Sequence, residues 1–381
     1  MHIAILGAGP AGLYLAYLVK RRDPGADVRV FEQNRADATF GFGVVFSDRA
    51  LEFLNEDDPG TLGAIVPHLE SWTDITLAHG GERVRIDGVG FAAISRLRLL
   101  QLLQERARSV GVEPSYRHAV GDLGEVAEAD LVVGADGVNS LVRRAHAAAF
   151  GATTTYLTNR FAWFGTAQTF DTLTQTFRRS DLGDFNAHHY RYAPAMSTFI
   201  VEVTAATFAR AGFERMGEAE SAAACARVFA ADLDGHPLVS NHSVWRQFPI
   251  VRNARWSHGR CVLIGDALHT AHFSIGSGTR LAMEDAIALD RALAAHPGDL
   301  VAALDAFEAA RRPIVEKLVD AANASGAWYE RFADHVALAP LDFAMSYVTR
   351  SGRVDLERLR QASPRFVARY ERERTGFRGM G

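Results

Sequence analysis

The sequence predicts an α/β fold in which a parallel, nucleotide-binding sheet carries an inserted β-rich domain and a C-terminal helical layer. Two observations predict it. Three short apolar runs, at residues 2–6, 129–134 and 260–264, each lead into a glycine-containing loop, as buried parallel strands do in nucleotide-binding sheets. Residues 160–250 are instead rich in aromatic residues with strand-like alternation, which is typical of β structure. At 381 residues, the chain is long enough for about two domains.

The first run carries the most specific motif. It is followed by Gly7-Ala8-Gly9-Pro10-Ala11-Gly12 and then by an apolar helix over residues 13–20. In such a turn the glycines allow a tight bend, close approach to a pyrophosphate and helix–strand packing, and the helix N-terminus attracts the anion. A second strand ends at Glu32, 20 residues after Gly12, where an acidic side chain holds a ribose hydroxyl. An ordinary glycine turn is the alternative, but the order of elements favours dinucleotide binding.

The other two runs place acidic residues at the ends of predicted strands. Asp136-Gly137 follows the second run, and Gly265-Asp266 follows the third. Acidic residues at the carboxyl end of a strand face the ligand crevice of an open α/β sheet. The glycine-containing segment 273–280 comes next and leads into a helix. The sequence therefore predicts three loops that face a nucleotide.

A glycine-rich apolar segment, residues 39–48, follows the second strand. We predict a loop that packs its backbone against a flat ring, and the alternative is a hydrophobic connector. Ser47 or Asp48 can cap a helix from Arg49 to Leu54.

These elements divide the chain into three parts. The predicted nucleotide-binding domain comprises residues 1–72, 91–159 and 251–300. The β-rich substrate domain comprises residues 73–90 and 160–250, and the C-terminal helical region residues 301–381. Expected elements within them are a helix over 96–110 capped by Ser95, a strand over 112–117, a hairpin over 75–86, four strands between 161 and 204, and a helix over 218–233. The C-terminal region shows no chemistry and is predicted to be a packing layer.

Composition argues against several classes of function. The formal net charge is −4, which gives no electrostatic case for nucleic acid. No uncharged apolar run approaches the length of about 20 residues that a membrane span needs. Cys225 and Cys261 lie far apart in apolar segments and are predicted to be buried thiols, without a disulfide or a metal site. Because the first motif leaves no room for a signal peptide, we predict a cytoplasmic protein. We also expect a monomer or a homodimer.

In their order and spacing, the three motifs resemble those of the single-component (class A) FAD-dependent aromatic hydroxylases of the para-hydroxybenzoate hydroxylase type. Segments 39–48, 197–202 and 271–279 resemble a narrower branch. That branch contains salicylyl-CoA 5-hydroxylase, the 2-aminobenzoyl-CoA monooxygenases and the tryptophan-derivative hydroxylase of violacein biosynthesis. The resemblance implies a Rossmann-like FAD-binding domain of the GR2 type, with FAD as cofactor and NADH or NADPH as electron donor.

The resemblance also implies a reaction. An electron-rich aromatic ring is hydroxylated with molecular oxygen through a flavin hydroperoxide, and an aryl-CoA thioester such as salicylyl-CoA is the favoured substrate. An indole, a tryptophan-derived compound or another free aromatic is the alternative within this class. An FAD-dependent reductase without oxygen chemistry is an alternative from another class. A non-enzymatic flavin-binding protein and a simple NAD dehydrogenase are less compatible with three nucleotide-facing loops.

The resemblance assigns roles to residues that match the family motifs. The glycine motif takes the pyrophosphate, Glu32 the adenosine ribose and Asp266 the ribityl side, while the backbone of residues 276–280 faces the pyrimidine end of the flavin. Asp136 and Gly137 match a motif linked to both FAD and the nicotinamide donor, and Arg96 matches an FAD-contacting arginine. The predicted cofactor contacts are Gly7, Gly9, Ala11, Gly12, Glu32, Gln33, Arg35, Gly43, Val44, Arg96, Asp136, Gly137, Asp266, Gly276, Gly278, Thr279 and Arg280.

The sequence departs from the family pattern at three positions. Phe273 stands where the family often has proline, and Phe42 and Val44 stand where para-hydroxybenzoate hydroxylase has arginines. Arg35 is the candidate to supply the missing positive charge.

Three residues are candidates for contact with the substrate or the oxygen. Strand alternation places His188 and Tyr190 on one face of a strand and His189 on the other, and His272 lies in the segment expected near the flavin. Ordinary packing is the alternative for each. His269 is expected to support its turn. Arg178 and Arg179 can meet CoA phosphates or be solvated surface residues.

Overall fold

The structure, a computed structural model, describes residues 1–47 and 50–378, with side chains through residue 374. The predicted cap Asp48 and the predicted helix start at Arg49 lie outside the described residues. The helix found after them, α2, is Phe53–Asp57, and α3 (Pro59–Ile65) follows it.

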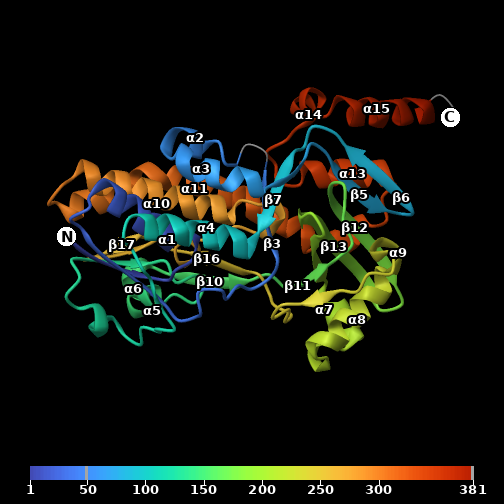
Figure 1. Cartoon of the computed structure of the whole chain (residues 1–381). Helices are drawn as coiled ribbons and strands as arrows, with labels where there is room; N and C mark the ends of the chain where they lie inside the picture. Colours follow the sequence, from blue (N-terminus) through green and yellow to red (C-terminus); the bar gives the residue numbers. More distant parts are fainter. Residues whose placement is uncertain (48–49, 379–381) are drawn as a thin grey trace.

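A six-stranded sheet forms the first half of the molecule (Figure 1). Its order is β17 (Ser257–His258), β18 (Cys261–Leu263), β9 (Leu131–Gly134), β1 (His2–Leu6), β2 (Asp27–Glu32) and β8 (Ser115–Tyr116). All neighbours are parallel except β17 and β18. Leu6 lies between Phe31 and Gly134, and Leu263 lies opposite Gly134. This register brings the three predicted motif loops to one edge of the sheet.

Helices cover both faces of this sheet. Helix α1 (Pro10–Arg22) packs between α4 (Arg96–Ser109) and α10 (Gly278–Ala295), and α10 packs against the long helix α11 (Leu300–Tyr329). The short helices α5 (Leu141–Ala145) and α6 (Ala147–Phe150) lie on the opposite side in Figure 1. As predicted, Ser95 caps α4 by accepting a hydrogen bond from the Arg98 amide at 3.4 Å.

A seven-stranded sheet forms the second half. Its order is β15 (Val239–Ser240), β11 (Arg160–Thr166), β14 (Met196–Val203), β13 (Gly183–Ala193), β12 (Leu173–Ser180), β5 (Ile75–His79) and β6 (Glu82–Ile86). The predicted hairpin is present and joins the sheet because β5 pairs in parallel with β12. Two helices, α8 (Glu218–Val228) and α9 (Ala230–Leu233), occupy the span of the single helix predicted over residues 218–233, and α7 (Ala205–Ala211) precedes them.

The prediction of a loop over residues 39–48 is wrong in its second half. Residues Gly43–Ser47 form β3, which pairs with β7 (Phe91–Ser95), and β7 pairs with β4 (Glu70–Trp72). Only a partner about 50 residues away along the chain turns this segment into a strand. A further pair, β10 (Thr153–Tyr156) with β16 (Pro249–Arg252), lies where the chain passes between the two large sheets.

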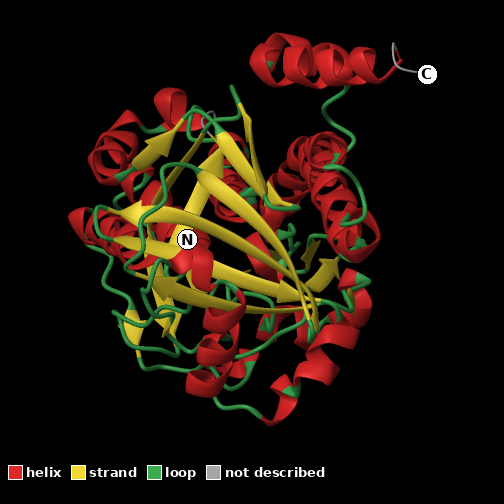
Figure 2. Cartoon of the chain, turned by 90° about the vertical axis from the view of Figure 1, so that its right-hand side faces the viewer, coloured by secondary structure: helices red, strands yellow, loops and turns green. Residues whose placement is uncertain are grey.

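The C-terminal region is helical, as predicted: α11 is followed by α12 (Phe332–His335), α13 (Pro340–Thr349), α14 (Leu356–Ala362) and α15 (Pro364–Arg378) (Figure 2). Trp328, Tyr329 and Phe332 pack with α13 against β5, β6 and β12 in one aromatic core. Cys225 and Cys261 are buried and unpaired. None of the described helices has the length and apolar character needed to cross a bilayer. The predicted domain boundaries stay a prediction.

Candidate active site

The three motif glycines differ in what surrounds them. A Cβ atom on Gly7, whose φ is +104°, would lie 2.3 Å from the Ala135 carbonyl oxygen, and one on Gly12 would lie 2.0 Å from the Gly7 carbonyl oxygen. A Cβ atom on Gly9 would meet nothing within 4 Å. Gly7 and Gly12 are therefore required by the fold, whereas Gly9 borders open space, as a glycine that admits a pyrophosphate must.

Two helix N-termini at this edge lack a side-chain cap. The N-cap residue of α1 is Gly9, which has no side chain, and that of α10 is Ser277, whose hydroxyl accepts no hydrogen bond from the helix. The hydroxyl of Ser277 is buried and has no partner. Because the first amides of a helix have no intrahelical acceptor, both ends offer donors and a positive dipole end. Gly278, Thr279 and Arg280 form the first turn of α10 and fit the predicted role of backbone donors.

Glu32 lies at the end of β2 and organises the neighbouring turns. Its carboxylate accepts a hydrogen bond from the Ala8 amide at 3.0 Å and from the Asn34 amide at 2.8 Å. Gln33 beside it is exposed. Arg35 is bound to Asp37 at the surface by two hydrogen bonds of 3.0 Å. Because Asp37 already binds the Arg35 guanidinium, it competes with the cofactor for the positive charge that Arg35 is predicted to supply.

Arg96 and Asp266 influence each other electrostatically and are both solvent-accessible and closely surrounded by protein. Both side chains are exposed to solvent, yet desolvation by surrounding protein lowers the pKa of the Arg96 guanidinium and raises the pKa of the Asp266 carboxyl. Each group also acts as an opposite charge on the pKa of the other. Solvent contact combined with many protein neighbours is expected for groups that line a concave site.

Asp136 has an unused hydrogen-bonding atom in the same region. Its Oδ2 accepts from the Leu141 amide at 2.6 Å, whereas its Oδ1 is buried without a partner. Burial raises the pKa of this carboxyl. Buried polar atoms are normally paired, so Oδ1 indicates a place for a ligand or water beside Gly137.

Residues of β3 and the 273–280 segment lie side by side. A Cβ atom on Gly276 would lie 3.1 Å from the Val45 carbonyl oxygen, and Gly43 donates its amide to Thr198 Oγ1 at 2.8 Å. Val44 is nearly buried, and the Arg96 amide donates to the Phe42 carbonyl at 2.8 Å. Arg280 binds Glu284 at 2.8 Å, so its side chain already has a partner. The open space at Gly9, the uncapped helix ends and the solvent-accessible Arg96 and Asp266 together fit FAD.

Replacing Asp266 with alanine is expected to weaken FAD binding. The substitution removes a carboxylate acceptor from the predicted cofactor site, and a hydrogen bond to a charged group is worth roughly 1.5–3 kcal/mol, or about 10- to 150-fold in affinity. Titration of the apoprotein with FAD, followed by flavin fluorescence, measures the change. An unchanged dissociation constant would show that Asp266 does not contact the cofactor.

Aromatic side chains surround Phe273, which stands where the family often has proline, and we call this group the aromatic recess. The ring centroid of Phe273 lies 4.9 Å from that of Phe161, 6.0 Å from Trp163 and 6.0 Å from Phe248. These four side chains are only partly buried, so each keeps some exposed surface. His188 and His272 complete the group, with ring centroids 5.2 and 4.3 Å from that of Phe273. The group offers flat apolar walls and two imidazoles.

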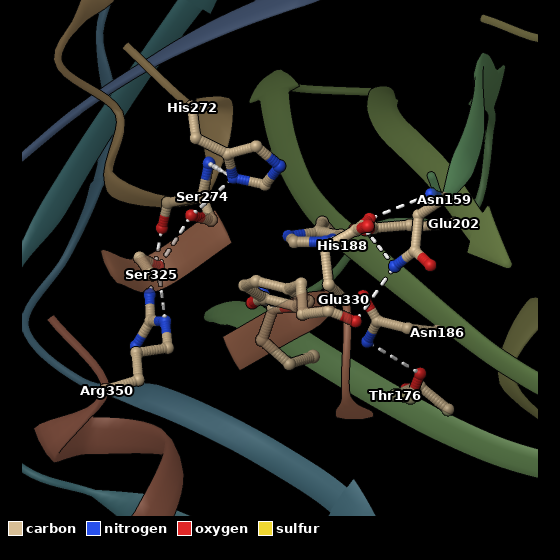
Figure 3. Close-up of polar contacts among 12 residues, drawn as sticks. Asn159, Thr176, Asn186, His188, Glu202, His272, Ser274, Ser325, Glu330 and Arg350 are labelled. Carbon is tan, nitrogen blue, oxygen red and sulfur yellow. Dashed lines mark hydrogen bonds and ion pairs between the residues drawn. The ribbon is translucent and has the colours of Figure 1, made fainter. Parts of the chain in front are cut away.

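His188 is paired with a buried carboxyl group. Its Nε2 lies 3.3 Å from Glu202 Oε2, and Glu202 Oε1 accepts a hydrogen bond from Asn159 Nδ2 at 2.8 Å (Figure 3). His188 and Glu202 are only 3% and 2% exposed. Burial, reinforced by Arg350, lowers the pKa of His188 to about 3, and burial raises the pKa of Glu202. Desolvation thus favours the uncharged form of both groups.

His272 is held by contacts with Ser274 and Phe248. Its Nδ1 lies 2.8 Å from Ser274 Oγ, and its ring packs on Phe248 with a centroid distance of 4.8 Å. Burial lowers its pKa to about 4. The structure therefore brings His188 and His272 to the same aromatic recess.

Tyr190, the third candidate, has a different environment. Its hydroxyl donates to the Gly43 carbonyl at 3.1 Å, and burial raises its pKa. In this position it anchors β3, and its contact with substrate stays a prediction.

Three other predicted residues have protein partners. His269 Nε2 lies 2.8 Å from Asp285 Oδ2, an oxygen that also accepts the Gly265 amide at 3.0 Å, so this histidine supports its turn. Arg178 binds Asp232 at 3.0 Å and Arg179 binds Asp184 at 2.7 Å.

Several residues at the recess are missed by the reasoning from sequence. Glu202 carries a signal, because a charged residue within the otherwise apolar run 199–203 is unusual. Arg350 and Ser325 carry none, because their role depends on how the C-terminal helices dock. The missed residues are Asn159, Phe161, Trp163, Glu202, Phe248, Ser274, Ser325, Tyr329 and Arg350.

Comparison with known proteins assigns the chain to a family. A family model described as an FAD binding domain matches residues 98–322, and one described as an NAD(P)-binding Rossmann-like domain matches residues 5–37. The chain is 45% identical over 361 residues to the salicyloyl-CoA 5-hydroxylase of a Streptomyces species, covering 92% of this chain and 70% of that protein. The chain belongs to the class A FAD-dependent aromatic hydroxylases.

Two further relatives of this aromatic hydroxylase match nearly end to end. It is 36% identical to the 3-hydroxy-4-methyl-anthranilyl-(aryl-carrier protein) 5-monooxygenase of Streptosporangium sibiricum, over 93% of this chain and 95% of that protein. It is also 36% identical to the protodeoxyviolaceinate monooxygenase of Chromobacterium violaceum, over 92% and 94% of the two chains. The predictions of family, of FAD as cofactor and of a flavin monooxygenase are confirmed.

Solved structures confirm the fold class of the aromatic hydroxylase. It matches 2-methyl-3-hydroxypyridine-5-carboxylic acid oxygenase with a TM-score of 0.69 at 20% identity, over 97% of both chains. A probable FAD-dependent monooxygenase from Pseudomonas aeruginosa matches with a TM-score of 0.66 at 21% identity, over 87% of this chain and 97% of that one.

Proposed function

We propose that this enzyme hydroxylates an aromatic ring that is carried as a thioester, with an aryl-CoA such as salicylyl-CoA as the first candidate substrate. The observation that carries the proposal is the 45% identity, over 92% of the chain, to a salicyloyl-CoA 5-hydroxylase. A second relative is named for an aryl group bound to a carrier protein, which is also a thioester-type substrate. With Cys225 and Cys261 as unpaired thiols, we expect the enzyme to work in the cytoplasm.

The chemistry of the recess supports a substrate without a free carboxylate. Among the described side chains in ring contact with Phe273, none is a cation, because burial keeps His188 and His272 neutral near pH 7. Arg350 lies nearby, but Ser325, the Ser274 carbonyl and the Tyr347 carbonyl already accept its hydrogen bonds. Burying an unpaired carboxylate is costly, whereas a thioester carbonyl needs only a hydrogen-bond donor.

The protein has few steps to carry out in such a reaction. When bound, FAD supplies the reducing equivalents that activate oxygen for transfer to the ring. Phe161, Trp163 and Phe273 bind and orient the ring and exclude water from it. A neutral imidazole, His188 or His272, donates a hydrogen bond to a ring substituent or receives a proton from it. The residues predicted around FAD are proposed to hold it at the edge where the three motif loops meet.

The test compares thioesters with free acids. Oxygen consumption, NAD(P)H oxidation and hydroxylated product are measured with salicylyl-CoA, anthraniloyl-CoA and benzoyl-CoA, and with the three free acids. We expect product from the two thioesters that carry an electron-donating substituent, and little from the free acids. Equal turnover of the free acids, or preference for an indole, would favour the alternative of a free aromatic substrate. Substrate-dependent NAD(P)H oxidation without oxygen uptake would contradict the proposal altogether.

A further inference from the structure

A chain of hydrogen bonds connects the C-terminal helices to His272 (Figure 3). Arg350, which follows α13, donates from Nε to Ser325 Oγ on α11 at 2.9 Å. Ser325 Oγ lies 2.7 Å from Ser274 Oγ, and Ser274 Oγ lies 2.8 Å from His272 Nδ1. Four residues from three distant segments thus form one continuous chain.

The direction of the hydrogen bonds follows from the two ends of this series. At one end a guanidinium only donates, so the Ser325 oxygen accepts from Arg350. At the other end the Ser274 amide N–H points at His272 Nδ1 at 3.4 Å, which makes this nitrogen an acceptor. The Ser274 hydroxyl therefore donates to Nδ1, and its oxygen accepts from the Ser325 hydroxyl. Nδ1 is therefore an acceptor, and the single proton of the neutral ring resides on Nε2.

The hydrogen-bond chain is anchored at Arg350, its first residue. Arg350 also donates to the Tyr347 carbonyl at 2.8 Å and to the Ser274 carbonyl at 2.9 Å, and its guanidinium lies 3.8 Å from the Tyr347 ring centroid. Ser325 is fully buried. A Cβ atom on Gly326 would lie 3.2 Å from His272 Cγ, so the glycine after Ser325 lets α11 approach the imidazole closely.

The far side of the imidazole is directed away from these hydrogen bonds, and the ring packs on Phe248 and Phe273. Figure 3 shows the second ring nitrogen of His272 on the side away from Ser274. The charged and titratable groups that affect His272 are Glu202, which favours its protonation, and His188 and Arg350, which oppose it. Desolvation is the largest effect and keeps the ring neutral near pH 7. A neutral ring with a proton on Nε2 is a hydrogen-bond donor toward the recess.

We propose that Arg350 is a positioning residue for the hydroxylation: through Ser325 and Ser274 it fixes the Nε2–H tautomer of His272. This tautomer presents one donor to an oxygen atom in the recess, such as the substrate carbonyl or the oxygen being transferred. The C-terminal layer, which the sequence indicates to be packing alone, thereby acts on the site. The catalytic consequence rests on the proposed binding of the substrate ring in the recess, whereas the tautomer itself does not.

The first test reads the tautomer directly. The holoenzyme is labelled with [¹⁵N]histidine, and the His272 signals are assigned by their loss in His272→Gln. We expect the wild type to show a protonated Nε2 and an unprotonated Nδ1. In Ser325→Ala and Arg350→Lys, which interrupt the chain, we expect the population of this tautomer to fall about fivefold to tenfold relative to the other, as the loss of one hydrogen bond predicts. Ser346→Ala is the matched control, because its hydroxyl accepts from Trp328 Nε1 in the same helical layer and is outside the chain.

The second test reads the reaction. With FAD content and Tm measured first, Ser325→Ala and Arg350→Lys are expected to lower product formed per NAD(P)H by about fivefold to tenfold, with hydrogen peroxide making up the difference and KM nearly unchanged. Unchanged ¹⁵N signals in both variants, or a wild-type signal with the proton on Nδ1, would overturn the proposal. A shifted tautomer with full coupling would overturn its catalytic part alone. Absence of turnover in the wild type with every thioester would count against the proposed substrate and leave the tautomer result standing.

Discussion

Replacing Gly9 with valine is expected to abolish retention of FAD while the protein stays folded. A side chain at this position enters open space in the protein, which is where the pyrophosphate is predicted to approach the backbone. Blocking that approach is expected to remove charge-assisted hydrogen bonds from the backbone to the pyrophosphate, so affinity should fall by about 100-fold or more. The measurement is the FAD content of the purified protein, together with the dissociation constant from titration of the apoprotein.

The control for this prediction is Gly63→Val. A Cβ atom on Gly63, in α3, would also meet nothing within 4 Å, and this glycine lies far from the motif in the chain. Its replacement should change neither FAD content nor Tm. Gly7→Ala should instead destabilise the fold itself, because its Cβ atom would lie 2.3 Å from a backbone oxygen. Normal FAD content in Gly9→Val would refute the assignment of this loop to the pyrophosphate.

His272→Ala is expected to uncouple NAD(P)H oxidation from hydroxylation. The substitution removes the neutral donor that faces the recess, while the predicted FAD contacts remain. Losing one preorganised donor to a developing negative charge typically costs about 10²- to 10³-fold in the chemical step. Product should therefore fall by about 100-fold with near-normal FAD content, and hydrogen peroxide should account for most of the NAD(P)H consumed. Both are measured in the same reaction.

A matched control separates catalysis from cavity formation. His189→Ala also removes a fully buried imidazole, but from the opposite face of β13, where His189 binds Thr176 at 2.9 Å and stacks on Phe199. It should lower Tm without changing the ratio of product to peroxide. Full coupling at the wild-type rate in His272→Ala would make this histidine structural, and His188 would become the leading candidate.

The two histidines of the recess differ in their hydrogen-bond partners: His272 contacts a serine hydroxyl and His188 contacts a carboxyl group. We infer different chemical roles from this difference. His272 faces a chain of donors that leaves it a hydrogen-bond donor toward the recess. His188 faces Glu202, whose raised pKa allows the carboxyl to be either donor or acceptor. A carboxyl–imidazole pair can store or release one proton, which suits the proton that leaves the ring substituent or the ring. We expect His272 to donate a hydrogen bond to an oxygen atom of the reacting groups, and we expect His188, with Glu202, to take up or release the proton.

Much of the fold is predictable because its signals are local. The glycine motif, the acid at Glu32 and the apolar strands depend on residues close together in the chain, and parallel pairing then brings their ends to one edge. Ser95 as a helix cap and the hairpin over residues 75–86 are local in the same way. Segment 43–47 is misjudged because its strand character depends on β7, a distant partner.

The sequence by itself indicated a dinucleotide cofactor and predicted residues for its site, because the motifs that bind such a cofactor are short and local. Only the tertiary structure decided how the aromatic recess is built. It buried His188 beside Glu202, surrounded Phe273 with aromatic rings and docked the C-terminal helices so that Arg350 reaches Ser274. The physical reason is that desolvation and hydrogen-bond direction arise from groups far apart in the chain, and their sum exists only after the helices and sheets have packed.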